Sequence, residues 1–224
     1  MELTDELTEE LLSSQADYYR RRASEYDVTC YGDVAAARTR IAGIVAQMQP
    51  AGTVLEIACG TGLWTEALAR TARMVTAIDV APEAVAIARD RVRAGNVRFE
   101  VADVFSWRAA ERFDVIFFCA WLSHVPDSRF EKFWQLLGGL IAEGGRVLFV
   151  DEPAELRDKE TYLPDGEEIA ERQLLDGSRY RIVKNFIVPE QLERRLRGLG
   201  WECRTWRYDD SDWVLVCGEA HPLA

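Results

Sequence analysis

The sequence has few histidines, no clustered cysteines and no long apolar runs, and each shortage argues against a class of function. Only two histidines, His124 and His221, occur among the 224 residues, and neither lies at metal-ligand spacing, so no bound metal is expected. The five cysteines form no Cys-x-x-Cys pair and the N-terminus has no secretory leader pattern, which predicts reduced thiols and a cytoplasmic protein. No apolar run approaches the roughly 20 residues of a membrane helix, so no membrane association is expected.

Positive charge is also scarce. Lysine and arginine number 27 against 38 acidic residues, giving a formal net charge of -11. Such a surface repels phosphate backbones, so nucleic acid is not an expected partner. Arg20 to Arg22 form the only tight basic run, and a solvated helix face would explain that run equally well.

The middle of the chain has the pattern of an α/β domain. From Val54 onward, short apolar runs alternate with amphipathic stretches, which predicts βα units on a mostly parallel sheet. Expected strands are 53–58, 74–78, 97–101, 113–120 and 146–150, with helices from Leu63, from Pro82 and from a capping box at Ser128 to Glu131. The closely spaced runs 202–208 and 213–218 predict an antiparallel pair.

One domain is expected, with two additions to its core. Residues 50–150 form the predicted core, and residues 1–49 look like a helical cap. Residues 151–188 form an insertion in which Asp176-Gly177 predicts a β-hairpin, and residues 189–224 supply the final helix and strands. Both additions are placed to cover the carboxyl ends of the strands, where open α/β sheets bind ligands.

A glycine turn follows the first strand, in the run Glu56-Ile57-Ala58-Cys59-Gly60-Thr61-Gly62. Gly60 and Gly62 let the backbone approach a ligand closely. A dinucleotide-binding turn needs a third glycine where Thr65 stands, so the turn suits a ligand without pyrophosphate. Asp79 ends the next strand, where a carboxylate can accept both ribose hydroxyls; capping the helix at Pro82 is its alternative role.

This turn resembles motif I of the class I S-adenosylmethionine (SAM)-dependent methyltransferases, with Glu56, Gly60 and Gly62 matching and Ala58 replacing a glycine. The resemblance implies a Rossmann-like, mostly parallel seven-stranded sheet with a C-terminal antiparallel strand pair. It also implies that SAM is the cofactor and S-adenosylhomocysteine (SAH) the product. By the same resemblance Glu56 orders the loop or the amino group of SAM, Val80 packs on the adenine, and Asp103 and Val104 bind its edge.

The segment Tyr18 to Asp27 is similar to the opening of many bacterial small-molecule methyltransferases. There the helix folds over SAM, which implies that Arg22 and Tyr18 or Tyr19 face the methionine carboxylate. A guanidinium matches a carboxylate bidentately. A surface helix with stacked aromatic rings is an equally open interpretation.

The loop after the fourth strand is expected to line the transferring methyl group, beginning at Ala120. His124 is the imidazole available there and a candidate general base, although it could simply brace the loop. The Asp/Asn-Pro-Pro-aromatic motif of nucleic-acid amino methylation is missing, which favours a small-molecule acceptor. Candidate acceptor contacts are Trp121, Tyr162, Arg172, Tyr180 and Lys184.

The sequence therefore predicts methyl transfer from SAM to an oxygen, nitrogen or sulfur atom of a small metabolite. Two alternatives stay open: a SAM-binding protein with other chemistry or none, and an NAD(P)-dependent oxidoreductase. The predicted hairpin is also a candidate contact for a homodimer.

Overall fold

A computed structural model describes residues 5–163, 168–210 and 212–223. Its centre is a seven-stranded sheet in the order β3-β2-β1-β4-β5-β9-β8. The parallel strands are β1 (Thr53–Ile57), β2 (Met74–Asp79), β3 (Val97–Val101), β4 (Phe113–Cys119) and β5 (Ile141–Asp151). The strand order reverses between β1 and β4, where this architecture opens a crevice at the strand ends.

The last two strands reverse direction. β9 (Val214–Pro222) runs antiparallel to both β5 and β8 (Trp201–Asp209). This confirms the predicted antiparallel pair and the mostly parallel seven-stranded sheet. The sequence prediction underestimated the length of β5, which begins five residues earlier than expected at Ile141.

Two apolar cores lie on the two faces of the sheet. One face is covered by α3 (Val34–Met48), α4 (Leu63–Leu68) and α5 (Pro82–Arg91), and the other by α6 (Asp127–Leu140) and α7 (Pro189–Gly198). The β1 side chains alternate between these cores, so Val54 packs in one while Leu55 and Ile57 pack in the other. The sheet is thereby buried on both faces, as parallel sheets require.

The start of α6 differs from the prediction. The expected capping box placed its first residue at Ser128, but the helix begins at Asp127 after Pro126, and the Asp127 N–H donates to the Glu168 carboxylate at 3.0 Å. Proline fixes its own φ near the helical value and so favours this earlier start. Gly138 and Gly139 do not end the helix, because the apolar face of Phe133, Trp134 and Leu137 is fully buried.

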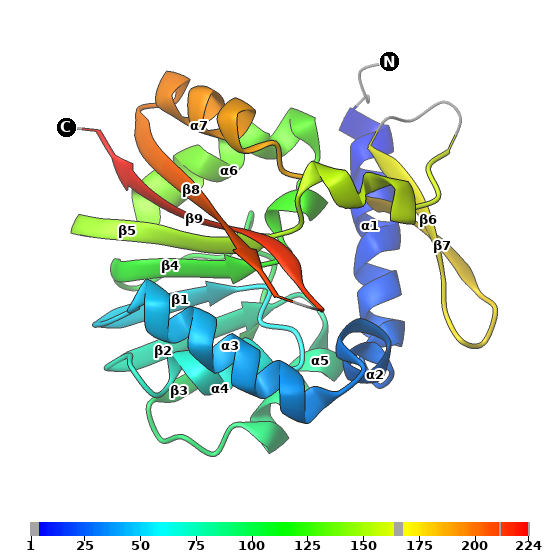
Figure 1. The fold of residues 1–224 in the computed structure, drawn as a ribbon, viewed down its shortest axis with the longest axis horizontal. Coiled ribbons are helices and arrows are strands. Elements are labelled where there is room, and N and C mark those ends of the chain that lie inside the picture. Colours follow the sequence, from blue (N-terminus) through cyan, green and yellow to red (C-terminus); the bar gives the residue numbers. More distant parts are fainter. Residues whose placement is uncertain (1–4, 164–167, 211, 224) are drawn as a thin grey trace.

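The helical cap and the insertion form a layer at the carboxyl ends of the strands (Figure 1). α1 (Asp5–Arg22) crosses this edge, followed by α2 (Tyr26–Tyr31). The hairpin of β6 (Ile169–Gln173) and β7 (Arg179–Val183) packs on the outer side of α1, and η1 (Leu122–His124) and η2 (Ala154–Lys159) flank this layer. A small apolar cluster of Tyr18, Ala170, Leu174 and Ile182 joins α1 to the hairpin.

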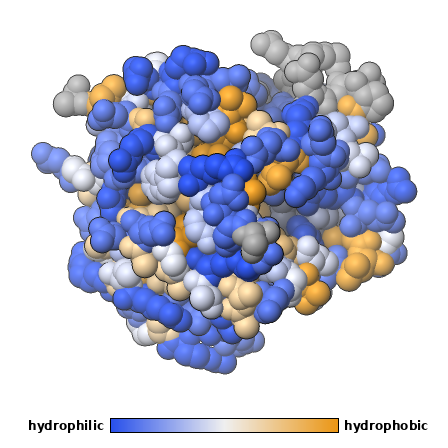
Figure 2. Space-filling view, in the orientation of Figure 1, coloured by the Kyte–Doolittle hydropathy of each residue, from blue (hydrophilic) through white to orange (hydrophobic). Residues whose placement is uncertain are grey.

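The outer surface agrees with the charge of the chain. Figure 2 shows a mostly hydrophilic face on which hydrophobic residues gather in small groups. None of the helices within the described ranges is long and apolar enough to cross a membrane. The same residues contain no cluster of three or more histidine, cysteine or acidic side chains that could hold a metal ion.

Candidate functional site

A cavity of about 380 Å³ lies where the carboxyl ends of β1, β2, β3 and β4 meet the underside of α1. Apolar side chains form most of its wall, and Gly60, Asp79, Asp103 and Ala120 line it at the strand ends. The first strands therefore bring together residues that lie far apart in the sequence, as expected for parallel strands ending at one edge of a sheet.

The two glycines of the turn have different roles. Gly60 has φ +53°, lines the cavity, and has no atom within 4 Å of the position that a Cβ would occupy. Gly62 has φ +84°, but a Cβ there would lie 2.9 Å from the Cβ of Ala88 in α5. Gly60 thus gives the backbone access to a ligand, whereas Gly62 allows the turn to pack against α5.

Ala58 shows why this position commonly holds glycine. Its φ is +56°, in the left-handed region that costs a residue with a Cβ about 1 kcal/mol or more. Ala120, at the end of β4, has φ +48° and lines the same cavity. Backbone strain of this kind gathers at functional sites, and Ala58 and Ala120 directly follow β1 and β4, the two strands that flank the reversal in strand order.

Asp79 binds the turn through its carboxylate. One oxygen accepts the Gly60 N–H at 2.8 Å and the other accepts the Ala81 N–H at 2.8 Å, and burial raises the pKa of the carboxyl. A carboxylate has about four acceptor positions, so two remain for ribose hydroxyls. The alternative role considered for Asp79, capping the helix at Pro82, is not found: the N-cap of α5 is Ala81, and Asp79 accepts the N–H of that residue.

The adenine-side candidates lie at the neighbouring strand ends. Asp103 is exposed, and its Oδ1 accepts the Phe105 N–H at 3.1 Å. Val104 is buried and Val80 is 40% exposed, and all three residues line the cavity. They provide two apolar side chains and one carboxylate, which suits an aromatic base with an amino group.

Glu56 is buried on the α4 side of β1 and does not line the cavity. Its Oε2 has no hydrogen-bond partner among the described residues, and burial raises the pKa of the carboxyl to about 8. A fully buried carboxyl is costly when ionised, so with a pKa of about 8 this group is mostly protonated at neutral pH. Its position under the turn is consistent with ordering the loop.

α1 is attached to the main body by polar contacts that the sequence did not indicate. The Gln15 amide donates to the His124 carbonyl at 3.1 Å and accepts the Val183 N–H at 2.9 Å. Asp27, just past α1, accepts from the Thr61 hydroxyl at 2.6 Å and pairs with Arg91. Gln15 belongs to no motif, and Asp27 ends the Tyr18 to Asp27 motif without any indication of its partners, so only the folded chain reveals these contacts.

A second, larger cavity of about 1280 Å³ adjoins the first. The residues that line both cavities are Tyr19, Tyr26, Cys119, Ala120 and His124. We call this shared wall the junction. A group bound in the first cavity and a molecule bound in the second would meet there.

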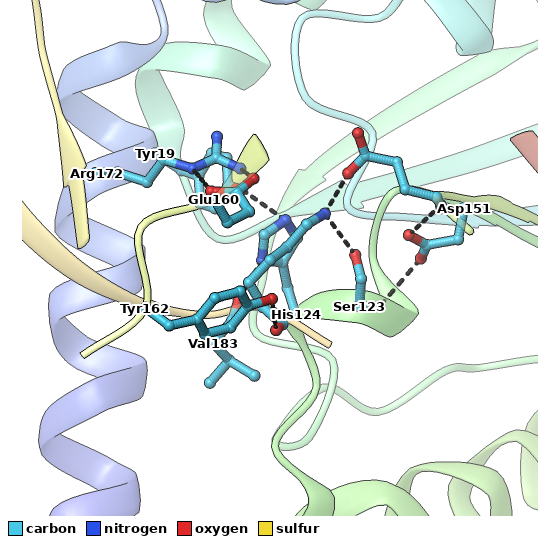
Figure 3. A network of polar contacts seen from close by, with 10 residues as sticks. Tyr19, Ser123, His124, Asp151, Glu160, Tyr162, Arg172 and Val183 are labelled. Atoms are coloured by element: carbon cyan, nitrogen blue, oxygen red, sulfur yellow. Dashed lines mark hydrogen bonds and ion pairs between the residues drawn. The ribbon is translucent and has the colours of Figure 1, made fainter. Parts of the chain in front are cut away.

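His124 is held on both sides of its ring. Nδ1 lies 2.6 Å from the Val183 carbonyl oxygen and Nε2 lies 2.8 Å from the Tyr19 hydroxyl (Figure 3). Burial, and then the nearby cations Lys184, Arg172 and Arg22, lower the pKa of the imidazole well below its usual value. The ring is therefore neutral at physiological pH.

Three cations surround His124, and two of them are balanced. Lys184 is buried and pairs with Glu152, and its ammonium donates to the Ser123 hydroxyl at 3.2 Å. Arg172 pairs with Glu160, with Nε 2.8 Å from Oε2 (Figure 3).

The third cation is Arg22, which is 9% exposed. Its guanidinium donates to the Thr29 hydroxyl at 3.0 Å and lies 4.8 Å from the Tyr26 ring centroid. Among the described carboxylates, none lies within ion-pair distance of Arg22. Buried charges are normally paired, so this guanidinium leaves room for a bound anion.

The other predicted contacts are more dispersed. Trp121 lines the cofactor-side cavity rather than the larger one. The Tyr162 hydroxyl donates to the Lys184 carbonyl at 2.8 Å, so this residue supports the wall. Tyr18 and Tyr180 pack in the cluster between α1 and the hairpin and line neither cavity.

The face of β7 that points inward is now defined. Tyr180 and Ile182 pack towards α1, whereas Arg179 and Arg181 are exposed.

Sequence reasoning also missed the support beneath Lys184. Asp151 is buried at the end of β5 and accepts the Ser123 N–H at 3.0 Å and the Glu152 N–H at 2.8 Å. An acidic pair ending a strand was the available signal for this arrangement.

Known proteins share both the sequence and the fold. A family model described as a methyltransferase domain matches residues 54–145. A ubiquinone biosynthesis O-methyltransferase of Xanthomonas axonopodis pv. citri is 32% identical over 166 residues, which cover 72% of this chain and 67% of that protein. The matching enzyme of Xanthomonas campestris pv. campestris is 33% identical, and 62% of its length is covered.

Solved structures extend this likeness over nearly the whole chain. The DhpI–SAH complex is 38% identical, with a TM-score of 0.79, and the match covers 95% of this chain and 97% of that one. The DhpI–SAM–HEP complex gives 38% identity and a TM-score of 0.80. The glycopeptide N-methyltransferase MtfA, at 20% identity and a TM-score of 0.63, shares the fold. This chain belongs to the class I SAM-dependent methyltransferases and methylates a small molecule with SAM as its cofactor.

Proposed function

We propose that this enzyme transfers the methyl group of SAM to an oxygen atom of a small acidic acceptor. The observation that carries the proposal is the set of cations around the junction: Arg172 and Lys184 pair with Glu160 and Glu152, whereas Arg22 has no carboxylate partner among the described residues.

The smaller cavity suits SAM. Asp79 has free acceptor positions for the ribose hydroxyls, Asp103 and Val104 offer an edge for adenine, and Gly60 leaves open space for close approach. The unpaired guanidinium of Arg22 suits the methionine carboxylate, with Tyr19 and Tyr26 beside it. When bound, SAM supplies an activated methyl group on a sulfonium.

Charge then favours an acidic acceptor. With Arg22 assigned to the carboxylate of SAM, the remaining cations Arg172 and Lys184 lie on the acceptor side. An anion in this low-dielectric region is attracted by the sulfonium, and it can share the side chains of Arg172 and Lys184 with their partners Glu160 and Glu152. An anionic oxygen also needs no base, which agrees with a neutral His124 whose two ring nitrogens already have partners.

The protein contributes mainly alignment and exclusion of water. α1 covers the smaller cavity and the insertion borders the larger one, so the two reactants would meet at an enclosed junction. Holding the two reactants in line removes a large part of the activation free energy of a bimolecular reaction. The O-methyltransferase relatives favour oxygen as the methylated atom.

Other features support a small-molecule enzyme of the cytoplasm. All five cysteines are free, and burial raises the pKa of Cys59, Cys119 and Cys217. Such thiols are poorly reactive and suit a reducing compartment. The acidic surface argues against nucleic acid as the acceptor.

The test is a panel assay with methyl-labelled SAM. Small carboxylic and phosphonic acids are compared with neutral alcohols and amines of matched size, and the products are identified by mass spectrometry. We expect label on an acid, with a methyl ester as the product. Methylation confined to the amines or neutral alcohols would overturn the proposal.

A further inference from the structure

The hydrogen bonds around His124 determine which atom carries each proton. A carbonyl oxygen can only accept, so the 2.6 Å contact with Val183 requires a proton on Nδ1. A neutral imidazole then has a lone pair on Nε2, and the Tyr19 hydroxyl 2.8 Å away must donate to it. The proton of Tyr19 is therefore committed to His124.

The charged groups around the ring keep it in this state. Lys184 follows β7, Arg172 lies on β6 and Arg22 ends α1, and each disfavours a second proton on the imidazole, which would make the ring positive. Glu152 and Glu160 face this group, but they pair with Lys184 and Arg172 respectively. Arg129 on α6 lines the neighbouring cavity and pairs with Glu9.

Tyr19 is fixed from several sides. Its ring packs against Tyr18 at a centroid distance of 4.9 Å and against the His124 ring at 5.4 Å. Gln15, one helical turn earlier, ties the same stretch of α1 to the His124 carbonyl and the Val183 amide. The backbone groups that hold Gln15 thus belong to the same residues that orient the imidazole.

We propose that Tyr19, and not His124, is the residue that positions the acceptor at the junction, and that His124 acts through it. Because the Tyr19 proton points to Nε2, its oxygen offers only lone pairs to the cavity. An acceptor reaches this oxygen through an O–H or N–H group of its own, which orients the neighbouring atom for methylation. The inference rests on the proposed methyl transfer, but its central arrangement can be tested without any acceptor.

The first test is nitrogen NMR of the protein labelled in histidine and bound to SAH. The chain has only two histidines, and His221→Gln assigns the signals. We expect His124 to show a protonated Nδ1 and an unprotonated Nε2 from about pH 5 to about pH 8. Tyr19→Phe should move the Nε2 signal towards that of an unbonded ring nitrogen. A His124 ring protonated on Nε2 at neutral pH would overturn the inference.

The second test is a double-mutant cycle with labelled SAM and the best acid of the panel. Tyr19→Phe and His124→Gln should each lower kcat/KM about tenfold, the worth of one hydrogen bond, and the double variant should be no worse than either. SAH affinity should stay within about threefold of the wild type. Tyr208→Phe is the matched control, because the Tyr208 hydroxyl donates to Asp210 and neither residue lines a cavity.

The two tests separate the possible failures. A general base would give a much larger loss for His124→Gln than for Tyr19→Phe, with additive effects, and would overturn the inference while leaving methyl transfer intact. If no acid is methylated, the proposed function fails, and the NMR result still decides how His124 and Tyr19 share their proton.

Discussion

The two cavities are built in different ways. The cofactor cavity takes most of its walls from successive strand ends between Ile57 and Trp121, together with one face of α1. The larger cavity draws on α1, α2, the insertion and the final strands, which are distant in the sequence. The first is mostly apolar and has one ion pair in its wall, Glu9 with Arg129, whereas the second contains several ion pairs. The comparison shows that one side depends on local turns, whereas the other depends on long-range polar pairing.

Asp79→Ala should produce the largest effect, because it removes the central polar group of the cofactor side. Two hydrogen bonds from ribose to a charged oxygen are worth about 3 kcal/mol or more, so SAM affinity should fall at least roughly 100-fold. The Gly60 and Ala81 amides also lose their acceptor, which adds to the loss. Calorimetric titration with SAM and SAH measures the change.

Asp90→Ala is the matched control, because Asp90 lies on α5 with its side chain 86% exposed. It should bind SAH as the wild type does. Unchanged SAH affinity in Asp79→Ala would mean that the cofactor lies elsewhere. The smaller cavity would then no longer be the cofactor cavity.

Glu56→Gln should remove a pH-dependent loss of folding stability that arises beneath the glycine turn. The folded carboxyl has a pKa of about 8 against 4.5 for its ordinary value, so unfolding releases a proton between these pH values. The free energy of unfolding therefore falls as pH rises from 4.5 to about 8, and it is flat above. Each unit of pKa difference is worth about 1.4 kcal/mol, so the total is a few kcal/mol.

Denaturant unfolding at several pH values tests this prediction. The variant should be more stable than the wild type at pH 8 and nearly equal to it at pH 4.5. A wild-type protein as stable at pH 8 as the variant would show that Glu56 ionises freely in the folded state.

The same contrast explains what the sequence could and could not predict. Strand β3 was predicted at its observed bounds, and the glycine turn and the aspartates Asp79 and Asp103 lie together as expected, because strand period and turn chemistry are local. The contacts of Gln15 with His124 and Val183, and of Asp27 with Thr61, join segments far apart in the chain. No local pattern encodes such partners. Likewise, the burial of Tyr180 depends on α1, which packs beside the hairpin only in the folded chain.

Arg172→Gln should affect the acceptor side alone. Loss of a charged contact costs about 1.5–3 kcal/mol, so kcat/KM for an acid should fall roughly 10- to 100-fold while SAH affinity is unchanged. Arg181→Gln is the control, since Arg181 lies on the same hairpin, is exposed and lines neither cavity. Steady-state kinetics with the acid that the enzyme methylates distinguishes the two variants. Equal losses in both variants would point to the general charge of the hairpin instead of a specific contact.

Gly62→Ala and Gly60→Ala should give the smallest effects. They distinguish the contribution of each glycine to the stability of the fold from its contribution to SAH binding. Both place a Cβ at positive φ, which costs about 1 kcal/mol or slightly more, but only the Gly62 variant also crowds Ala88. Gly62→Ala should therefore lower the Tm by a few degrees more than Gly60→Ala. Conversely, only Gly60→Ala places a methyl group in the cofactor cavity, so it should weaken SAH binding more. Thermal unfolding with and without SAH measures both quantities. If Gly62→Ala weakened SAH binding as much as Gly60→Ala, the turn would respond as one unit, because strain at the α5 contact would reach the cavity wall.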